Sequence, residues 1–103
     1  MAWRRARGIT RPIFADVARF SERKLATYEK QKSLPAEVVR PVRESLRLLA
    51  ALGSLCGDAE ALADWLRKRN AAFENRAPLE LIKRGEADRL WEMVHQVRHG
   101  AFA

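Results

Sequence analysis

Apolar residues recur every three or four positions along most of this 103-residue chain. That spacing is typical of amphipathic helices, which place one apolar stripe toward a core. Ala, Leu, Arg, Lys and Glu dominate, β-branched residues are sparse, and no alternating run long enough for a strand occurs. The pattern therefore predicts an all-α fold.

Two short helices are predicted near the start of the chain. The first spans about residues 12–18, with Thr10 as its N-cap and a proline in the opening turn. Ser21 is a good N-cap for the second, which continues to about Lys30. Only residues 19–21 separate the two helices, a link as short as that of a helix-turn-helix.

A longer helix is predicted over about residues 36–55 and would connect the two halves of the chain. Pro41 lies early in this segment and indicates either its first turn or a kink, because proline removes a backbone hydrogen bond. Gly53 and Gly57 follow, and these glycines indicate a boundary near residues 55–57. The apolar positions that define this helix are Val38, Val42, Leu46, Leu49 and Leu52.

Three further helices are predicted in the second half. Asp58 caps one that ends at about Arg69, and a polar loop over residues 70–76 follows it. A proline and a glycine bracket a short helix over residues 79–84, and the last helix covers residues 86–99. The side chains expected to face inward are Leu62, Trp65, Leu66, Leu90, Trp91, Val94 and Val97, and Phe73 interrupts the polar loop.

Positive charge is concentrated in the first half of the chain. The net charge is +7; residues 1–50 contain twelve Lys and Arg against five Asp and Glu, whereas residues 51–103 contain eight of each. Such an asymmetry favours a basic module that faces a polyanion, joined to a neutral module with a different task.

The composition also indicates where the protein acts. Cys56 is the only cysteine, which excludes an intrachain disulfide and fits a reducing compartment. No apolar stretch follows the basic start at residues 4–7 that would serve as the core of a signal peptide, and no segment is apolar enough to span a bilayer. We therefore expect a cytoplasmic protein that does not insert into membranes.

The chain offers little that would support catalysis. Glu92, His95 and His99 have helical spacing, but a third strong ligand and the HExxH pattern are missing, so an exposed histidine pair is the better interpretation. Neither a glycine-rich phosphate loop nor a nucleophile motif around Cys56 occurs. We expect no catalytic residue, no metal site, no cofactor and no enzymatic activity.

The segment FADVARFSERKLATYE at residues 14–29 resembles helices two and three of an Xre-type helix-turn-helix. Ala15, Val17 and Leu25 would pack the two helices together and leave the start of the second helix free for a major groove. The alternative interpretation is a pair of amphipathic helices with a solvated basic face. The residues expected to contact DNA are Arg11, Ser21, Arg23, Lys24 and Thr27.

A second resemblance covers about residues 52–103. It is more specific, because several residues that mark helix starts, helix ends and turns occur in the same order as in a known family. They are Gly57, Asp58, Ala61, Trp65, Leu66, Asn70, Phe73, the run Arg76–Leu81, Gly85, Arg89, Val94 and the run His99–Ala103. Together they look like the C-terminal toxin-binding domain of the Xre/MbcA/ParS antitoxin family. The sequence departs from that family at Ala77, where a threonine cap is common, and at Glu74-Asn75, where a glycine is often seen.

This resemblance implies an antitoxin of a type II toxin–antitoxin system. Such a protein binds a RES-domain toxin, an enzyme that degrades NAD, blocks its active-site cleft, and usually represses its own operon in complex with it. Phe102, beyond the helix-ending Gly100, would be an exposed anchor for the toxin, although most chain ends are merely frayed. The toxin-contacting residues that the resemblance implies are Asn75, Arg76, Pro78, Leu79, Arg98, His99, Gly100, Ala101 and Phe102.

The sequence thus predicts a DNA-binding region at residues 1–34, a connecting helix at residues 35–55 and a toxin-binding domain at residues 56–103. The expected partners are a RES-domain toxin, operator DNA and a second copy of the chain, because paired half-sites need a two-fold protein. The main alternative is a freestanding transcriptional regulator whose C-terminal bundle only dimerises. Another is an adaptor that uses its basic half on membranes or RNA.

Overall fold

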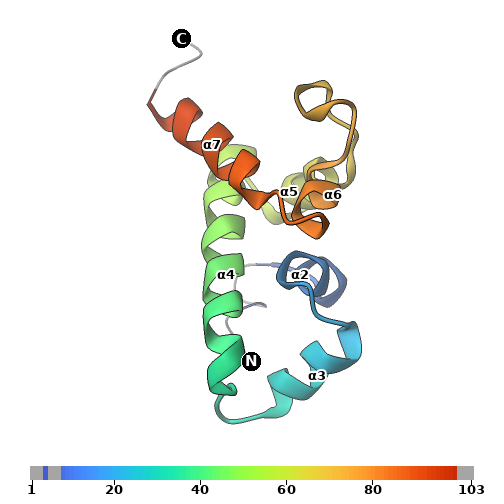
Figure 1. Cartoon of the computed structure of the whole chain (residues 1–103), viewed down its shortest axis with the longest axis vertical. Coiled ribbons are helices and arrows are strands. Elements are labelled where there is room, and N and C mark those ends of the chain that lie inside the picture. The colour runs from blue at the N-terminus through green and yellow to red at the C-terminus, as the bar shows by residue number, and fades with distance from the viewer. Residues whose placement is uncertain (1–3, 5–7, 100–103) are drawn as a thin grey trace.

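The computed structural model describes Arg4 and residues 8–99, and these residues form helices joined by short links (Figure 1). The elements are α2 (Arg11–Ala18), α3 (Glu22–Lys30), α4 (Ala36–Cys56), α5 (Ala59–Arg67), the 3-10 helix η1 (Ala71–Phe73), α6 (Pro78–Lys83) and α7 (Ala87–Arg98). Within the described part, the only extended pairing is an isolated bridge between Asn70 and Arg76. The predicted all-α fold is confirmed.

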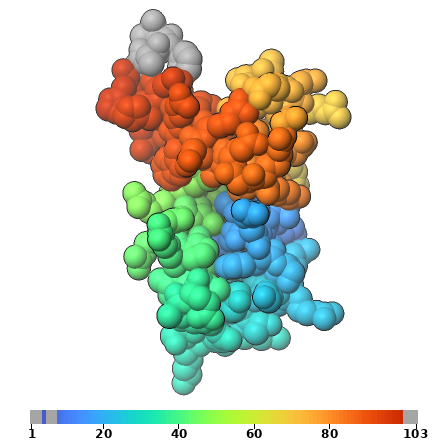
Figure 2. All heavy atoms as spheres, viewed as in Figure 1, coloured from blue at the N-terminus to red at the C-terminus, as the bar shows by residue number. Residues whose placement is uncertain are grey.

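The longest helix, α4, runs along the length of a molecule that measures 45 × 24 × 22 Å (Figure 1). The helix α3 lies toward the end where α4 begins. The helices α5, α6 and α7 gather toward the end where α4 finishes, and α2 lies between the two groups and contacts α3, α4 and α6. The surface of α2 therefore adjoins the C-terminal half directly (Figure 2).

The predicted helix starts are largely confirmed by their caps. The Ser21 hydroxyl accepts a hydrogen bond from the Lys24 amide at 3.1 Å, and the Asp58 carboxylate accepts one from the Ala61 amide at 2.8 Å. Both satisfy backbone donors that a first helical turn leaves unpaired. Thr10 occupies the N-cap position of α2, but its side chain makes no capping hydrogen bond.

Pro41 lies inside α4, in its second turn. The interpretation of Pro41 as part of the first turn is therefore wrong, because the helix already begins at Ala36. A proline at this position cannot donate the backbone hydrogen bond to the residue four positions earlier. The helix nevertheless continues to Cys56, and its buried face packs against α2, α5 and α7.

A single hydrophobic core runs through both halves of the molecule. Ile13, Phe14 and Val17 of α2 belong to the same cluster of buried side chains as the core residues of the C-terminal helices. The side chains with less than 2% exposure are Phe14, Leu25, Leu49, Leu52, Leu66, Pro78, Leu81, Leu90 and Val94. The charge break in the sequence does not coincide with a break in the core.

Three of the side chains predicted to face inward do not lie in the core. Val97 is 43% exposed, so its predicted inward orientation is wrong. Trp65 and Trp91 are only half-buried and pack against the edge of the core. The helix α5 also ends at Arg67, two residues before the predicted end.

The N-terminal segment is fitted closely onto the C-terminal half at Gly8. This glycine has φ = +69°, and a Cβ atom built on it would lie 2.9 Å from the Cβ of Ala59, at the start of α5. That distance is shorter than real Cβ contacts allow. The Lys83 ammonium adds an ion pair with Asp16 at 3.7 Å, which links α6 to α2.

Candidate interaction surfaces

The helix α3 presents a polar, cationic face to solvent at one end of the molecule. Arg23, Lys24 and Thr27 are exposed, and only Leu25 of this helix is buried. The Ser21 hydroxyl is engaged in capping the helix, and the Thr27 hydroxyl donates to the Arg23 carbonyl at 3.1 Å. Arg23 and Lys24 form no ion pair with another described residue, and they lie at the start of the helix, where a groove-reading helix makes its contacts.

The turn between α2 and α3 is built without glycine. Arg19 takes the left-handed conformation, with φ = 64°, which glycine would adopt at less cost. Its backbone N–H and that of Phe20 both donate to the carbonyl of Ala15, which closes the end of α2. Phe20 also packs edge-on against Tyr28, with ring centroids 5.4 Å apart, and so fixes the angle between the helices.

A buried ion cluster joins the start of the chain to the end of α3. The Arg4 guanidinium donates to both carboxylate oxygens of Glu29, at 2.6 and 3.1 Å, and to the carbonyl of Ile9 at 2.8 Å. Arg11 donates to the same carboxylate at 3.1 Å. The side chains of Arg4 and Glu29 are only 7% and 5% exposed. Hydrogen bonding from Arg4 lowers the pKa of Glu29, and Arg11 adds to that effect against the opposing influence of burial.

This cluster was not predicted from the sequence, because its members lie up to 25 residues apart. It also changes the setting of one predicted DNA contact. The side chain of Arg11 is 41% exposed, but its guanidinium forms an ion pair with Glu29, which reduces the positive charge available to DNA.

The loop between α5 and α6 is held by its own backbone. The Asn70 N–H donates to the Arg76 carbonyl, and the Asn70 carbonyl accepts from the amides of Phe73 and Asn75. Glu74 and Asn75 both have positive φ, 53° and 64°. These are the positions at which the sequence lacks the glycine often seen in the family, and the structure shows that the backbone there keeps a conformation that favours glycine.

Arg89 of α7 fastens this loop from outside. Its guanidinium donates to both oxygens of the Glu74 carboxylate, at 2.8 and 2.7 Å. It also lies 5.6 Å from the centre of the buried Phe73 ring, within the range of a cation–π interaction. The hydrogen bonds from Arg89 lower the pKa of Glu74, although the carboxylate itself remains exposed.

The residues predicted to contact a toxin fall into three groups. Asn75 is exposed on the loop and Arg76 is half-buried beside it, and both Arg98 and His99 are exposed at the end of α7. Pro78 and Leu79 are buried at the start of α6, directly after the loop. The remaining three, Gly100, Ala101 and Phe102, lie outside the described residues, as does Trp3.

The loop and the end of α7 project from the same end of the molecule, on opposite sides (Figure 1). The exposed face of α3 lies toward the other end. The structure therefore separates the two predicted surfaces along the 45 Å axis.

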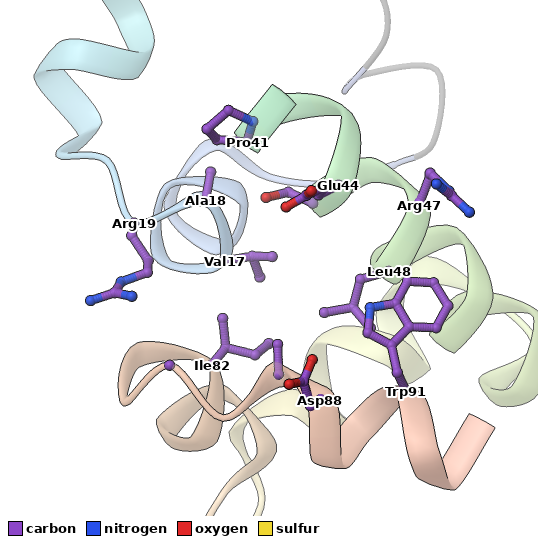
Figure 3. Close-up of a pocket in the computed structure, with 13 residues that line it drawn as sticks. Val17, Ala18, Arg19, Pro41, Glu44, Arg47, Leu48, Ile82, Asp88 and Trp91 are labelled. Carbon is purple, nitrogen blue, oxygen red and sulfur yellow. The ribbon is translucent and has the colours of Figure 1, made fainter. Parts of the chain in front are cut away.

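A groove of about 600 Å³ lies where α2, α4 and the α6–α7 link meet (Figure 3). Val17, Leu48 and Ile82 form its apolar floor. Trp91 closes one side, which explains why this tryptophan is only half-buried. The rim carries charges of both signs, from Arg19, Glu44, Arg47 and Asp88. This mixed lining selects no ligand class.

A more apolar groove of about 470 Å³ opens between the C-terminal end of α4, α5 and α7. We call it the α4–α5–α7 groove. Its rim residues Leu55 and Val97, 39% and 43% exposed, are the large hydrophobic side chains exposed in the described part of the chain. Its lining is Leu52, Leu55, Cys56, Ala61, Trp65, Met93 and Val97. The sequence did not predict this surface. Apolar spacing shows which face of a helix is apolar, but not where along the helix the packing against another helix ends.

Another apolar groove, of about 420 Å³, follows the outer face of α4. Leu34, Val39 and Leu46 line it, and Arg43 and Arg47 flank it.

His95 and His99 lie side by side at the end of α7, with ring centroids 4.2 Å apart. In the described residues, no group of three or more His, Cys, Asp or Glu side chains is placed to hold a metal ion. Nor is any helix there long and apolar enough to cross a membrane.

Comparison with known proteins identifies the C-terminal half. Residues 50–100 match the family model described as the antitoxin Xre/MbcA/ParS C-terminal toxin-binding domain. The matched segment contains the end of α4, the loop that Arg89 fastens, and the whole α4–α5–α7 groove. No curated protein and no solved structure gives a significant match.

Proposed function

Since residues 50–100 are a C-terminal toxin-binding domain of the Xre/MbcA/ParS antitoxin family, we propose that this chain is the antitoxin of a type II toxin–antitoxin system. Its partner is a RES-domain toxin that degrades NAD in the cytoplasm. Inhibition is steric: the antitoxin covers the active-site cleft and contributes no catalytic group or cofactor. The match over residues 50–100 is the observation that carries this proposal.

The toxin-facing end of the molecule is the one where the loop and α7 project. Asn75 and Arg76 contact the toxin from the loop side, and Arg98 and His99 from the end of α7. The four residues that follow carry Phe102 into the toxin cleft. Pro78 and Leu79 act indirectly, since their burial keeps the loop in place. A durable complex needs a buried interface of roughly 1,600 Å².

The opposite end is proposed to bind operator DNA. The exposed cations Arg23 and Lys24 at the start of α3 support this assignment, together with the positive charge of the first half. A homodimer, joined in a larger complex with the toxin, would repress the operon by presenting two copies of α3 to paired half-sites.

Co-expression with the product of the adjacent gene tests the toxin-binding function. We expect the two proteins to copurify, and the complex to lack the NAD-degrading activity of the free toxin. A freestanding regulator would not retain its neighbour, so separate elution together with intact operator binding would favour that alternative.

Variants of the chain end test the mode of inhibition. Deletion of residues 100–103, or Phe102→Ala, should weaken neutralisation of the toxin and leave operator binding unchanged. Equal loss of both functions would contradict the proposal.

A further inference from the structure

Exposed apolar surface is not spread evenly over this molecule. Leu55 ends an apolar stripe on α4, Val97 ends one on α7, and the two converge on the rim of the α4–α5–α7 groove. An isolated exposed leucine or valine needs no explanation, but two on the rim of one apolar groove mark a surface that a partner covers.

The groove has the composition of an interface centre. Trp65 forms one wall, and its ring meets that of the buried Phe73 edge-on at 6.4 Å, so the wall is anchored in the core. Met93 and Cys56 line the groove and supply polarisable atoms that adapt to an inserted side chain. Aromatic and methionine side chains are enriched at such centres, and charged ones are depleted. No charged side chain lines this groove.

The position of the groove points to the toxin as its occupant. Every lining residue lies between positions 52 and 97, within the segment that matches the toxin-binding domain, and none comes from α2 or α3. The rim residue Val97 directly precedes Arg98 and His99, which the proposed function already assigns to the toxin interface.

A second copy of the chain fits this groove poorly. The groove lies toward the end of the molecule opposite α3. End-to-end pairing there would place the two α3 helices at the far ends of the assembly. Half-sites of operator DNA are about 34–36 Å apart, a spacing that end-to-end pairing of 45 Å molecules would exceed.

We infer that the α4–α5–α7 groove is the apolar anchor site for the toxin, and that it receives an aliphatic or aromatic side chain from the toxin surface. This inference rests on the proposed function and extends it, because it moves the centre of the interface from the chain end to a preformed groove. The loop and the end of α7 then form the polar rim that excludes water around the anchor.

The test compares full-length variants for binding to the purified toxin encoded by the adjacent gene. Leu55→Asp and Val97→Asp place a carboxylate on the rim, where the exposure of both residues allows the fold to remain intact. Each is expected to weaken toxin affinity at least about tenfold, the range of an interface hot spot. Val39→Asp, in the outer groove of α4 and outside the core, is the control and should bind like the wild type.

Alkylation of Cys56 provides a readout that needs no substitution. The thiol lines the groove and is the only one in the chain. Burial, and to a smaller extent the charge of Asp58, raises its pKa, so labelling is run at mildly alkaline pH. Bound toxin should slow the reaction at least severalfold relative to the free chain.

The possible results separate this inference from the proposed function. If the wild-type chain does not bind the toxin, both fail. If the wild type binds, and the Leu55 and Val97 variants bind equally well, only the groove assignment is overturned.

Other occupants of the groove would give distinct results, and each would also overturn the inference. Retained toxin affinity with loss of a homodimer in these variants would assign the groove to a second copy. Retained affinity together with faster Cys56 alkylation after deletion of residues 100–103 would assign it to the end of the chain itself.

Discussion

At the scale of single residues, the carboxylate of Glu29 is the charged group on which the N-terminal half depends most. It is almost closed to water and is hydrogen-bonded by two guanidinium groups, those of Arg4 and Arg11. Its pKa is lowered from the ordinary value of 4.5. A group with a lowered pKa in the folded state contributes stability above its unfolded pKa, and that contribution is lost as the pH falls through the folded value.

Glu29→Gln should therefore lower the free energy of unfolding by about 2–3 kcal/mol at neutral pH, because the buried Arg4 would lose its counter-charge. The difference from the wild type should shrink as the pH falls from 4.5, where the carboxylate of the unfolded chain is protonated first, toward the lowered pKa of the folded state. Urea unfolding followed by circular dichroism at neutral and acidic pH measures both effects.

The exposed pair of Arg40 and Glu44 provides the control for this experiment. Both side chains are largely solvated, 88% and 61% exposed, and such pairs add little to stability. Glu44→Gln should leave the unfolding midpoint unchanged. If Glu44→Gln lowered the free energy of unfolding as much as Glu29→Gln does, burial would not be the reason for the contribution of Glu29 to stability.

Arg89 is the second residue with an effect beyond its own position. Arg89→Ala removes the two hydrogen bonds to Glu74 and the cation–π interaction with Phe73. We expect amide hydrogen exchange at Asn75 and Arg76 to become roughly tenfold faster, because the loop would open more often. Toxin affinity should fall in parallel.

Arg89→Lys keeps the charge but not the two-pronged geometry of the guanidinium. It should therefore rescue the loop only in part. If Arg89→Ala showed the same amide exchange rates as the wild type, the backbone hydrogen bonds of Asn70 alone would be sufficient to hold the loop.

At the scale of helices, α3 is expected to act as an independent cationic surface. Arg23→Glu with Lys24→Glu changes exposed residues only, so folding and toxin binding should persist. Operator affinity should fall, and the slope of log affinity against log salt concentration should decrease by about 0.9 for each DNA phosphate that the variant no longer neutralises. Fluorescence anisotropy over a salt series measures this slope.

Lys68→Glu with Arg69→Glu reverses the same number of exposed charges in the other half of the chain and is the control for this experiment. It should leave operator affinity nearly unchanged. Equal decreases in both variants would mean that net charge, and not the face of α3, governs binding.

Helices were the level at which the sequence was most informative. Ser21 and Asp58 predicted their helix starts correctly, because a capping side chain acts within three residues of itself. Val97 was assigned to the wrong environment, since helical periodicity gives the direction of a stripe but not the point at which its neighbour ends. For the same reason, the α4–α5–α7 groove could only be found in the folded chain.

At the scale of the whole molecule, the continuous core makes the two halves depend on each other for folding. Burial of Ile13, Phe14 and Val17 of α2 contributes about 1.5–3 kcal/mol each. Their sum is comparable with the about 5–15 kcal/mol that keeps a domain folded. The Arg4–Glu29 pair and the packing of α2 on α6 are long-range features, which local sequence patterns do not reveal.

A fragment of residues 35–103 should consequently fail to unfold cooperatively, although it contains the complete toxin-binding segment. Thermal unfolding followed by circular dichroism, with the full chain as reference, measures this. A cooperative transition at the midpoint of the full chain would show that the C-terminal half is an independent domain.

The tight seat of Gly8 against Ala59 has a consequence for how such proteins can be recombined. A chimera that joins a different DNA reader to this C-terminal half would bring another side chain to the start of α5, and any Cβ there would push the incoming module out of register. Exchange of DNA specificity between relatives is therefore constrained at this point. A new DNA-binding module needs a glycine at the position of Gly8, or the C-terminal half needs a smaller residue in place of Ala59.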